Sequence, residues 1–195
     1  MKFFTSDLHF GDDESIISDG RPYKDAHDFQ TKVIKQWNKV AGKDDIIYAI
    51  GDFIDCHSPD TKKPVEMLGV VRKIKAKVVL ILGNNEERII KYHFGGDYEK
   101  FREYCLSLGY LDVKKNDVVA IEGNNFYLTH KAKDHIDSML NLFGHSHKAM
   151  GIYKTFGFHI GCDLNNYQLY SEKDIMKLLE KKQQYWDKDE NLRLV

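Results

Sequence analysis

The sequence has little cysteine and little proline, three of each in 195 residues. Cys56, Cys105 and Cys162 are odd in number, lie far apart and form no Cys-x-x-Cys pair. We therefore predict three reduced thiols, and neither a disulfide framework nor a thiolate zinc site. Hydrophobic residues make up 42% of the chain and charged residues 30%, which excludes a disordered or fibrous protein. A chain of this length fits one domain, so we expect residues 1–195 to form a single domain.

The sequence also lacks a charge excess and any long apolar run. Lysine and arginine total 29 against 30 aspartates and glutamates, so bulk charge gives no argument for a polyanionic partner. No stretch approaches the roughly 18–20 apolar residues that a membrane span needs, and residues 1–4 run directly into a polar segment, unlike a signal peptide. We expect a cytoplasmic protein with no membrane partner. The sequence leaves the oligomeric state open.

Short apolar runs alternate with helical patterns in the first half of the chain. Runs rich in β-branched and aromatic residues predict strands at 2–6, 45–50 and 77–82. Apolar residues at helical spacing predict helices over 25–41 and 64–74. This alternation favours parallel strands joined by crossovers.

The second half predicts shorter elements in close succession. The expected strands cover 110–114, 118–122, 126–129, 151–155 and 158–161. We expect helices over 97–108 and near 134–141, and a last helix that opens at Ser171, because Ser171 and Asp174 approximate a capping box. The charged end, 181–195, is expected to be solvated. The overall prediction is an α/β fold with mixed sheets.

Polar side chains follow the first three predicted strands at the point where each strand ends. Asp7 and His9 follow the first strand, Asp52 and Asp55 follow the second, and Asn84 follows the third. Because ligands bind outside the carboxyl ends of the strands in open α/β sheets, we expect these side chains to converge on one site.

Three of the nine histidines extend this set. His130 ends a predicted strand, and His145 and His147 stand two residues apart, where alternate side chains of an extended segment point the same way. Taken singly, each motif is more often a turn, a helix start or a surface residue. Their shared position at strand ends favours a common site.

This mixture of carboxylate, amide and imidazole donors predicts a metal centre. Imidazoles with carboxylates suit transition metals, whereas an all-oxygen shell would suit Mg²⁺ or Ca²⁺. We expect two divalent ions about 4 Å apart, Mn²⁺ first and Fe, Co, Ni or Zn as alternatives, with Asp52 as the natural bridge. A hydroxide between two such metals is a nucleophile near neutral pH, which favours hydrolysis of a phosphate ester or anhydride.

The order of these blocks resembles the calcineurin-like metallophosphoesterase family over nearly the whole chain. The blocks are Asp7-x-His9, Gly51-Asp52-x-x-Asp55, Gly83-Asn84, His130 and Gly144-His145-x-His147. Residues 6–11, 21–23 and 161–167 further resemble small stand-alone bacterial and bacteriophage members. The resemblance implies an α/β fold of two mixed β-sheets packed face to face, with helices on the outside.

The resemblance also implies how the residues divide their roles. The implied ligands of one metal are Asp7, His9, Asp52 and His147. The implied ligands of the other metal are Asp52, Asn84, His130 and His145. Asp55 would orient a ligand. The implied catalytic residues are Asp52, Asp55, Asn84 and Asn85.

Two departures from the family pattern bear on the substrate. A histidine usually follows the Gly-Asn pair and is commonly assigned to protonating the leaving group, whereas this chain has Asn85 followed by Glu86. Asparagine cannot act as a general acid, whose help is typically worth roughly 10²- to 10⁴-fold. We therefore expect a phosphodiester or phosphoanhydride, as in a nucleotide, another phosphorylated small molecule or a nucleic-acid end. The second departure, Asp12 in place of a frequent histidine, leaves that residue's substrate contact open.

Two cations are weaker candidates for the site, and one alternative function stays open. Arg21 and Lys131 could clamp a phosphate oxygen, although single cations are usually solvated surface groups. The remaining histidines match no motif and are expected at the surface or in packing: His27, His57, His93, His135 and His159. The alternative function is a catalytically reduced scaffold that binds proteins. The complete set of ligand-competent residues favours the enzyme.

Overall fold

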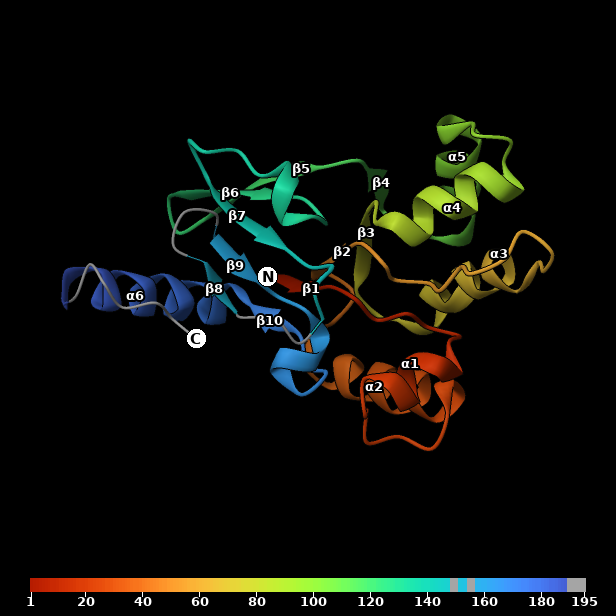
Figure 1. The fold of residues 1–195 in the computed structure, drawn as a ribbon, viewed down its shortest axis with the longest axis horizontal. Helices are drawn as coiled ribbons and strands as arrows, with labels where there is room; N and C mark the ends of the chain where they lie inside the picture. The colour runs from red at the N-terminus through yellow and green to blue at the C-terminus, as the bar shows by residue number, and fades with distance from the viewer. Residues whose placement is uncertain (148–150, 154–156, 189–195) are drawn as a thin grey trace.

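Two mixed five-stranded β-sheets lie face to face at the centre of the protein (Figure 1). This computed structural model describes residues 1–147, 151–153 and 157–188. The first sheet has the order β10-β1-β2-β3-β4, in which β1 to β4 run parallel and β10 pairs antiparallel with β1. Its strands are β1 (Lys2–Thr5), β2 (Ile46–Ile50), β3 (Lys77–Ile81), β4 (Asp112–Lys114) and β10 (Tyr170–Ser171).

The second sheet has the order β5-β6-β7-β9-β8. Its inner pairs, β6 with β7 and β7 with β9, are parallel, and the outer pairs are antiparallel. Its strands are β5 (Asp117–Ile121), β6 (Asn124–Leu128), β7 (Leu140–Phe143), β8 (Ile152–Tyr153) and β9 (Gly157–His159). The expected fold class, two mixed sheets with helices, is confirmed.

Helices flank the first sheet and its connections (Figure 1). The α-helices are α1 (Asp13–Ser18), α2 (Ala26–Val40), α3 (Lys63–Met67), α4 (Asn84–His93), α5 (Tyr98–Leu108) and α6 (Glu172–Lys188). The 3₁₀ turns are η1 (Leu68–Lys73), η2 (Ala132–Asp134) and η3 (Cys162–Asn165). Aspartates at the N-caps of α1, α2 and α5 accept backbone N–H bonds, which explains where these helices begin.

The two faces of the first sheet pack against different partners. Phe3 faces the helices with Trp37, whereas its neighbour Phe4 faces the second sheet with Phe126, because successive side chains of a strand point to opposite faces. The buried indole N–H of Trp37 donates to the backbone oxygen of Tyr167, 3.0 Å away. The α6 helix adds Ile175 to the core between the sheets.

The prediction of a short helix near 134–141 is wrong. Ala132–Asp134 forms a single 3₁₀ turn, and Leu140–Phe143 is β7. Asn141 is fully buried in this strand, and its side chain bonds the backbone of Ile136 and Met139. Parallel pairing with β6 and β9 therefore decides the structure here, and local periodicity does not contain that information.

Other boundaries also differ from the expectations. The helix expected over 64–74 divides into α3 and η1, and α1, α4 and β10 were not predicted. Part of the strand expected over 151–155 and the end of the chain from 189 lie outside the described residues. In the described ranges, every helix is too short or too polar to cross a membrane. The three cysteines are buried free thiols, as predicted.

Candidate metal centre

The predicted ligand residues come together where the loops after β1, β2, β3, β6 and β7 meet. Asp7 and His9 follow β1, Asp52 follows β2, and Asn84 is the first residue of α4, directly after β3. From the second sheet, His130 follows β6. His145 and His147 follow β7. The expected convergence at strand ends is therefore present, and three of the four imidazoles, those of His130, His145 and His147, come from the second sheet.

The backbone at this site is held in a conformation that most residues avoid. Asp7, His9, Asp52, His145 and His147 all have positive φ, at 61°, 51°, 49°, 77° and 44°. Non-glycine residues rarely adopt the left-handed region, and such residues cluster at functional sites. Contacts with the surrounding residues must therefore hold these loops in the left-handed conformation. Nothing in the spacing of the motifs indicates this strain.

One cluster comprises Asp7, His9 and His147, whose ligand atoms lie within 4.8 Å of one another. Oδ2 of Asp7 and Nε2 of His9 are buried and have no hydrogen-bond partner among the residues that the structure describes. Buried polar atoms are nearly always paired, so these two atoms fit a cation placed between them. The other carboxylate oxygen of Asp7 accepts the backbone N–H of His145, 2.8 Å away.

The second cluster comprises Asp52, His130 and His145, also within 4.8 Å. Nδ1 of His130 lies 2.9 Å from the backbone oxygen of Ile50 and donates to it, since a carbonyl can only accept. This bond fixes the ring so that Nε2 faces Oδ1 of Asn84 at 3.2 Å and Oδ2 of Asp52 at 3.4 Å. A nitrogen lone pair facing two oxygens requires a proton or a metal ion between them, so this donor set also fits a cation.

Asp52 lies between the two clusters. Its Oδ2 is 3.6 Å from Nε2 of His9 and 3.4 Å from Nε2 of His130. Its Oδ1 accepts the backbone N–H of Asn85, 2.9 Å away. Burial alone would raise the pKa of Asp52. The nearby imidazoles of His130 and His9 outweigh this effect and lower the pKa well below its usual range. Burial likewise opposes the charged form of His130, yet the adjacent Asp52 carboxylate raises the pKa of His130 to about 9.

Asn85 and Asp55 both approach the far side of the His9 ring. Asn85 is buried, and its Nδ2 lies 3.2 Å from Nδ1 of His9. Its Oδ1 accepts from the backbone N–H of Cys56 and the guanidinium of Arg88. Oδ1 of Asp55 lies 3.7 Å from Nδ1 of His9. A metal on Nε2 requires the proton on Nδ1, and Asp55 is the neighbour that could accept it.

The two cations singled out in the sequence have different surroundings. Arg21 is buried and donates to the backbone oxygens of Asp7 and Leu8 at 2.8 and 2.7 Å, and it pairs with Asp163 at 2.9 Å. Its donors thus support the loop after β1, which does not favour the expected phosphate contact. Lys131 lies on the wall of an open cavity, 3.5 Å from Glu87.

Supporting carboxylates were missed by the sequence analysis. Oδ2 of Asp19 lies 2.9 Å from Nδ1 of His147 and orients that ring. The fully buried Glu86 accepts backbone N–H bonds from Gly83 and Asp52, at 2.8 and 2.9 Å, and so ties the loop after β2 to the start of α4. For Glu86 the only sequence signal is its place three residues after a strand-ending glycine, which matches the last residue of a capping box.

Two histidines that match no motif also lie beside the site. Nε2 of the fully buried His159 is 3.8 Å from Oδ2 of Asp7. The half-exposed His57 ring is 3.0 Å from Asp55 and 3.6 Å from Asp12. Asp12 itself caps α1 by accepting the backbone N–H groups of the first helical turn. These positions agree with packing and surface roles, and they place further imidazoles around the predicted ligands.

A model of the calcineurin-like phosphoesterase family matches residues 3–185. The chain therefore belongs to this family, whose members are phosphoesterases that generally bind divalent metals. An uncharacterised protein of Methanocaldococcus jannaschii is 27% identical over 189 residues, which cover 92% of this chain and 91% of that protein. The gene 66 protein of Mycobacterium phage L5 is 32% identical over 84 residues, which cover 43% of this chain and 39% of the phage protein.

The fold recurs in a solved structure of a protein of unknown function from Aquifex aeolicus. That structure has a TM-score of 0.66 and 19% sequence identity, and the match covers 91% of this chain and 98% of that one. At this identity the likeness supports the fold and does not extend to the substrate.

Proposed function

We propose that this protein is a dinuclear metal-dependent phosphohydrolase that acts on phosphodiesters or phosphoanhydrides. The observation that carries the proposal is the position of Asp52, whose Oδ2 lies within 3.6 Å of imidazole nitrogens from both clusters. A shared carboxylate between two ligand groups is the arrangement that a pair of divalent cations requires. Residues 1–195 would act as one domain.

The two clusters support an assignment of ligands to each cation. Asp7, His9 and His147 would hold one ion, His130, His145 and Asn84 the other, and Asp52 both. When bound, two divalent transition-metal ions, Mn²⁺ first, would supply Lewis acidity toward a phosphoryl group and a nucleophile near neutral pH.

The protein's own residues prepare this site. The backbone oxygen of Ile50 holds the Nδ1 proton of His130, and Asp19 does the same for His147, so both rings present Nε2 to the centre. Asp55 would hold the Nδ1 proton of His9. The carboxylate of Asp7 is already desolvated, and within the described ranges its Oδ2 has no competing hydrogen bond.

Asn85 supports the choice of substrate class. Its amide is buried, and its Oδ1 accepts from the backbone N–H of Cys56 and from Arg88, so Asn85 offers no titratable proton to a leaving group. Substrates whose leaving groups depart easily lose least from this absence. Phosphodiesters and phosphoanhydrides of nucleotides or nucleic-acid ends therefore suit the site better than simple alkyl monoesters.

The test is hydrolysis by the Mn²⁺-loaded protein of bis-p-nitrophenyl phosphate and glycerol phosphate, together with metal analysis. We expect two metal equivalents, cleavage of the aryl diester in preference to the alkyl monoester, and weaker rescue of the chelated enzyme by Ca²⁺ than by Mn²⁺. Asp52→Asn should abolish hydrolysis and release at least one metal, whereas Asp44→Asn, in an exposed turn, should change neither. Two bound metals with no hydrolysis of any phosphate substrate would favour the scaffold instead.

A further inference from the structure

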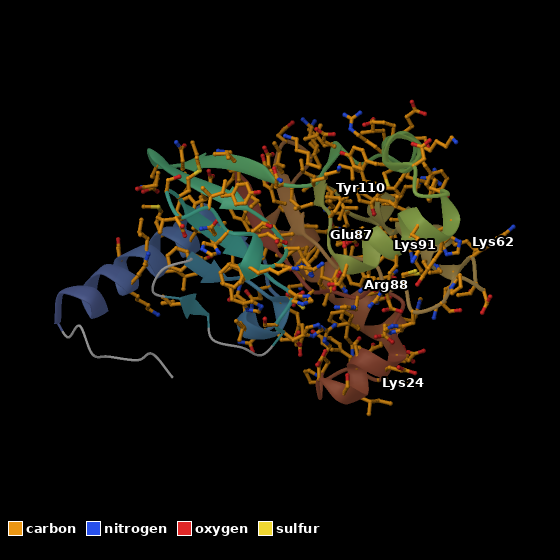
Figure 2. The ribbon with its side chains drawn as sticks, turned by 45° about the horizontal axis from the view of Figure 1, so that its top comes forward. Lys24, Lys62, Glu87, Arg88, Lys91 and Tyr110 are labelled. Atoms are coloured by element: carbon orange, nitrogen blue, oxygen red, sulfur yellow. The ribbon has the colours of Figure 1, made fainter. Side chains whose placement is uncertain are left out.

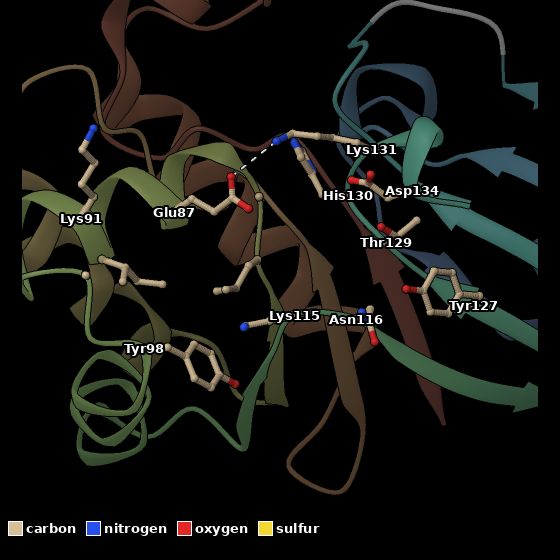
Figure 3. A pocket seen from close by; sticks show the side chains of 14 residues that line it. Glu87, Lys91, Tyr98, Lys115, Asn116, Tyr127, Thr129, His130, Lys131 and Asp134 are labelled. Atoms are coloured by element: carbon tan, nitrogen blue, oxygen red, sulfur yellow. Dashed lines mark hydrogen bonds and ion pairs between the residues drawn. The ribbon is translucent and has the colours of Figure 1, made fainter. Parts of the chain in front are cut away.

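A cavity of about 500 Å³ opens beside the candidate metal centre (Figure 3). It lies between α4, the turn from β4 to β5 and the end of β6. Its lining includes Gly83, which precedes the ligand Asn84, and the ligand His130. A group bound here would therefore be attached to, or directly next to, a phosphate at the metal centre. The volume is within the usual range of small-ligand pockets.

Three lysines from separate elements line the cavity. Lys91 extends from α4, Lys115 comes from the turn after β4, and Lys131 follows His130 (Figure 3). Lys131 is 3.5 Å from Glu87, which stands one turn before Lys91 on α4 (Figure 2).

Two of these lysines carry charge that nearby protein carboxylates do not neutralise. In the part of the chain that the structure describes, no carboxylate forms an ion pair with Lys91 or Lys115. Their ammonium groups lie over aromatic rings instead, Lys91 at 5.8 Å from the Tyr92 centroid and Lys115 at 5.6 Å from that of Tyr98. Ammonium groups of this kind remain available to an anionic ligand.

Two tyrosines supply an apolar surface in the same cavity. Tyr98 is half-buried, and its hydroxyl donates to the backbone oxygen of Val113 at 2.6 Å, which fixes the ring in the wall. Tyr127 extends from β6 on the opposite side of the cavity (Figure 3). Aromatic rings beside cations are the combination that binds nucleobases and the phosphates that flank them.

We propose that this lysine–tyrosine pocket, formed by Lys91, Lys115, Lys131, Tyr98 and Tyr127, binds a nucleoside and its next phosphate while the adjoining phosphodiester occupies the metal centre. The inference rests on the proposed function and specifies its substrate class. Tyr127 contacts the base and Lys115 the additional phosphate. Both a free nucleotide with two phosphates and the end of a single-stranded nucleic acid present a base with two flanking phosphates.

Three substrates with one leaving group test the pocket. They are methyl p-nitrophenyl phosphate, thymidine 5′-p-nitrophenyl phosphate, and the latter compound with an added 3′-phosphate. All three release p-nitrophenol, so differences in kcat/KM among them report how the rest of the substrate is bound. We expect kcat/KM to rise about tenfold with the nucleoside and about tenfold again with the 3′-phosphate, in line with the usual strength of base stacking and of charge-assisted hydrogen bonds.

Variants separate the two contributions. Lys115→Gln should remove most of the gain from the 3′-phosphate, while Tyr127→Ala should remove the gain from the nucleoside and Tyr127→Phe should retain it. Lys100→Gln, on the exposed face of α5, is the matched control and should leave the ratios among the three substrates unchanged.

The outcomes distinguish the two proposals. No hydrolysis of any of the three esters would overturn the proposed function. Hydrolysis of all three at similar kcat/KM, or equal effects of Lys115→Gln and Lys100→Gln, would overturn the pocket and leave the function standing. If the pocket is present, competition by thymidine 3′,5′-bisphosphate and by a 5′-phosphorylated oligothymidylate identifies the source, since the better inhibitor indicates a free nucleotide or a strand end.

Discussion

Nδ1 of His147 lies 2.9 Å from Oδ2 of Asp19, the residue that ends α1. The two residues are separated by 128 positions in the chain, and no motif spacing relates them. The contact sets which nitrogen of His147 faces the candidate metal centre. It therefore gives a short, unpredicted helix a direct part in building the site.

Asp19→Asn should weaken metal binding about tenfold, because removing a carboxylate behind a histidine ligand typically costs about 10- to 100-fold in metal affinity. Calorimetric titration of the metal-free protein with Mn²⁺ measures the effect. Asp44→Asn serves as the control for a change of one charge. An unaltered affinity for both ions would exclude a role for Asp19 in holding His147.

Arg21→Met should destabilise the protein by about 3–5 kcal/mol, because it leaves Asp163 buried without its ion-pair partner. Thermal or urea unfolding followed by circular dichroism measures the change. Arg72→Met, at an exposed position, should stay within about 0.5 kcal/mol of the parent. Removing both partners in Arg21→Met/Asp163→Leu should recover part of the loss. A stable Arg21→Met protein with only a raised KM would instead make Arg21 the phosphate clamp that the sequence suggested.

Gly83→Ala should disrupt the candidate metal centre. A Cβ atom at position 83 would collide with the backbone nitrogen and Oδ1 of Asp52, whereas one at Gly69 would meet no atom of the described residues within 4 Å. Gly69→Ala is thus a matched substitution that should be neutral or stabilise by up to about 1 kcal/mol. Metal content and thermal stability of the two variants make the comparison. Full metal occupancy in Gly83→Ala would contradict the close approach of this glycine to Asp52.

Metal binding should release protons near pH 7, because Asp52 raises the pKa of His130 from 6.5 to about 9 in the metal-free protein and a ligand imidazole must be neutral. The same pKa shift makes the stability of the metal-free protein depend on pH. Protonated His130 stabilises the metal-free protein fully below pH 6.5, and this contribution is lost as the pH rises through about 9.

Two measurements check this pH dependence. Titrations in buffers of different ionisation enthalpy count the released protons, and melting temperatures in chelator between pH 6 and pH 10 follow the stability. His130→Gln should reduce the pH-dependent part of both. Proton release that is identical in His130→Gln would assign the raised pKa to another group.

The sequence by itself determined which residues could form the centre. Asp7, His9, Asp52 and Asn84 follow short apolar runs that predict strands, and parallel strands bring their carboxyl ends to one edge. The alternation of strand and helix in the first half is local and periodic, so it could be predicted. The identity of the donors also follows from residue type, which tertiary structure does not change.

Only the tertiary structure decided how these residues are held. The strand β7 forms because β6 and β9 pair with it, and Arg21 is buried because Asp163 lies beside it. The left-handed backbone at His145 and His147 is held by Asp7 and Asp19, which bond to these two residues from the other end of the chain. Each of these depends on contacts between segments far apart in the chain. Periodicity and spacing describe only neighbours in sequence, so they carry no signal for such contacts or for the lysine–tyrosine pocket.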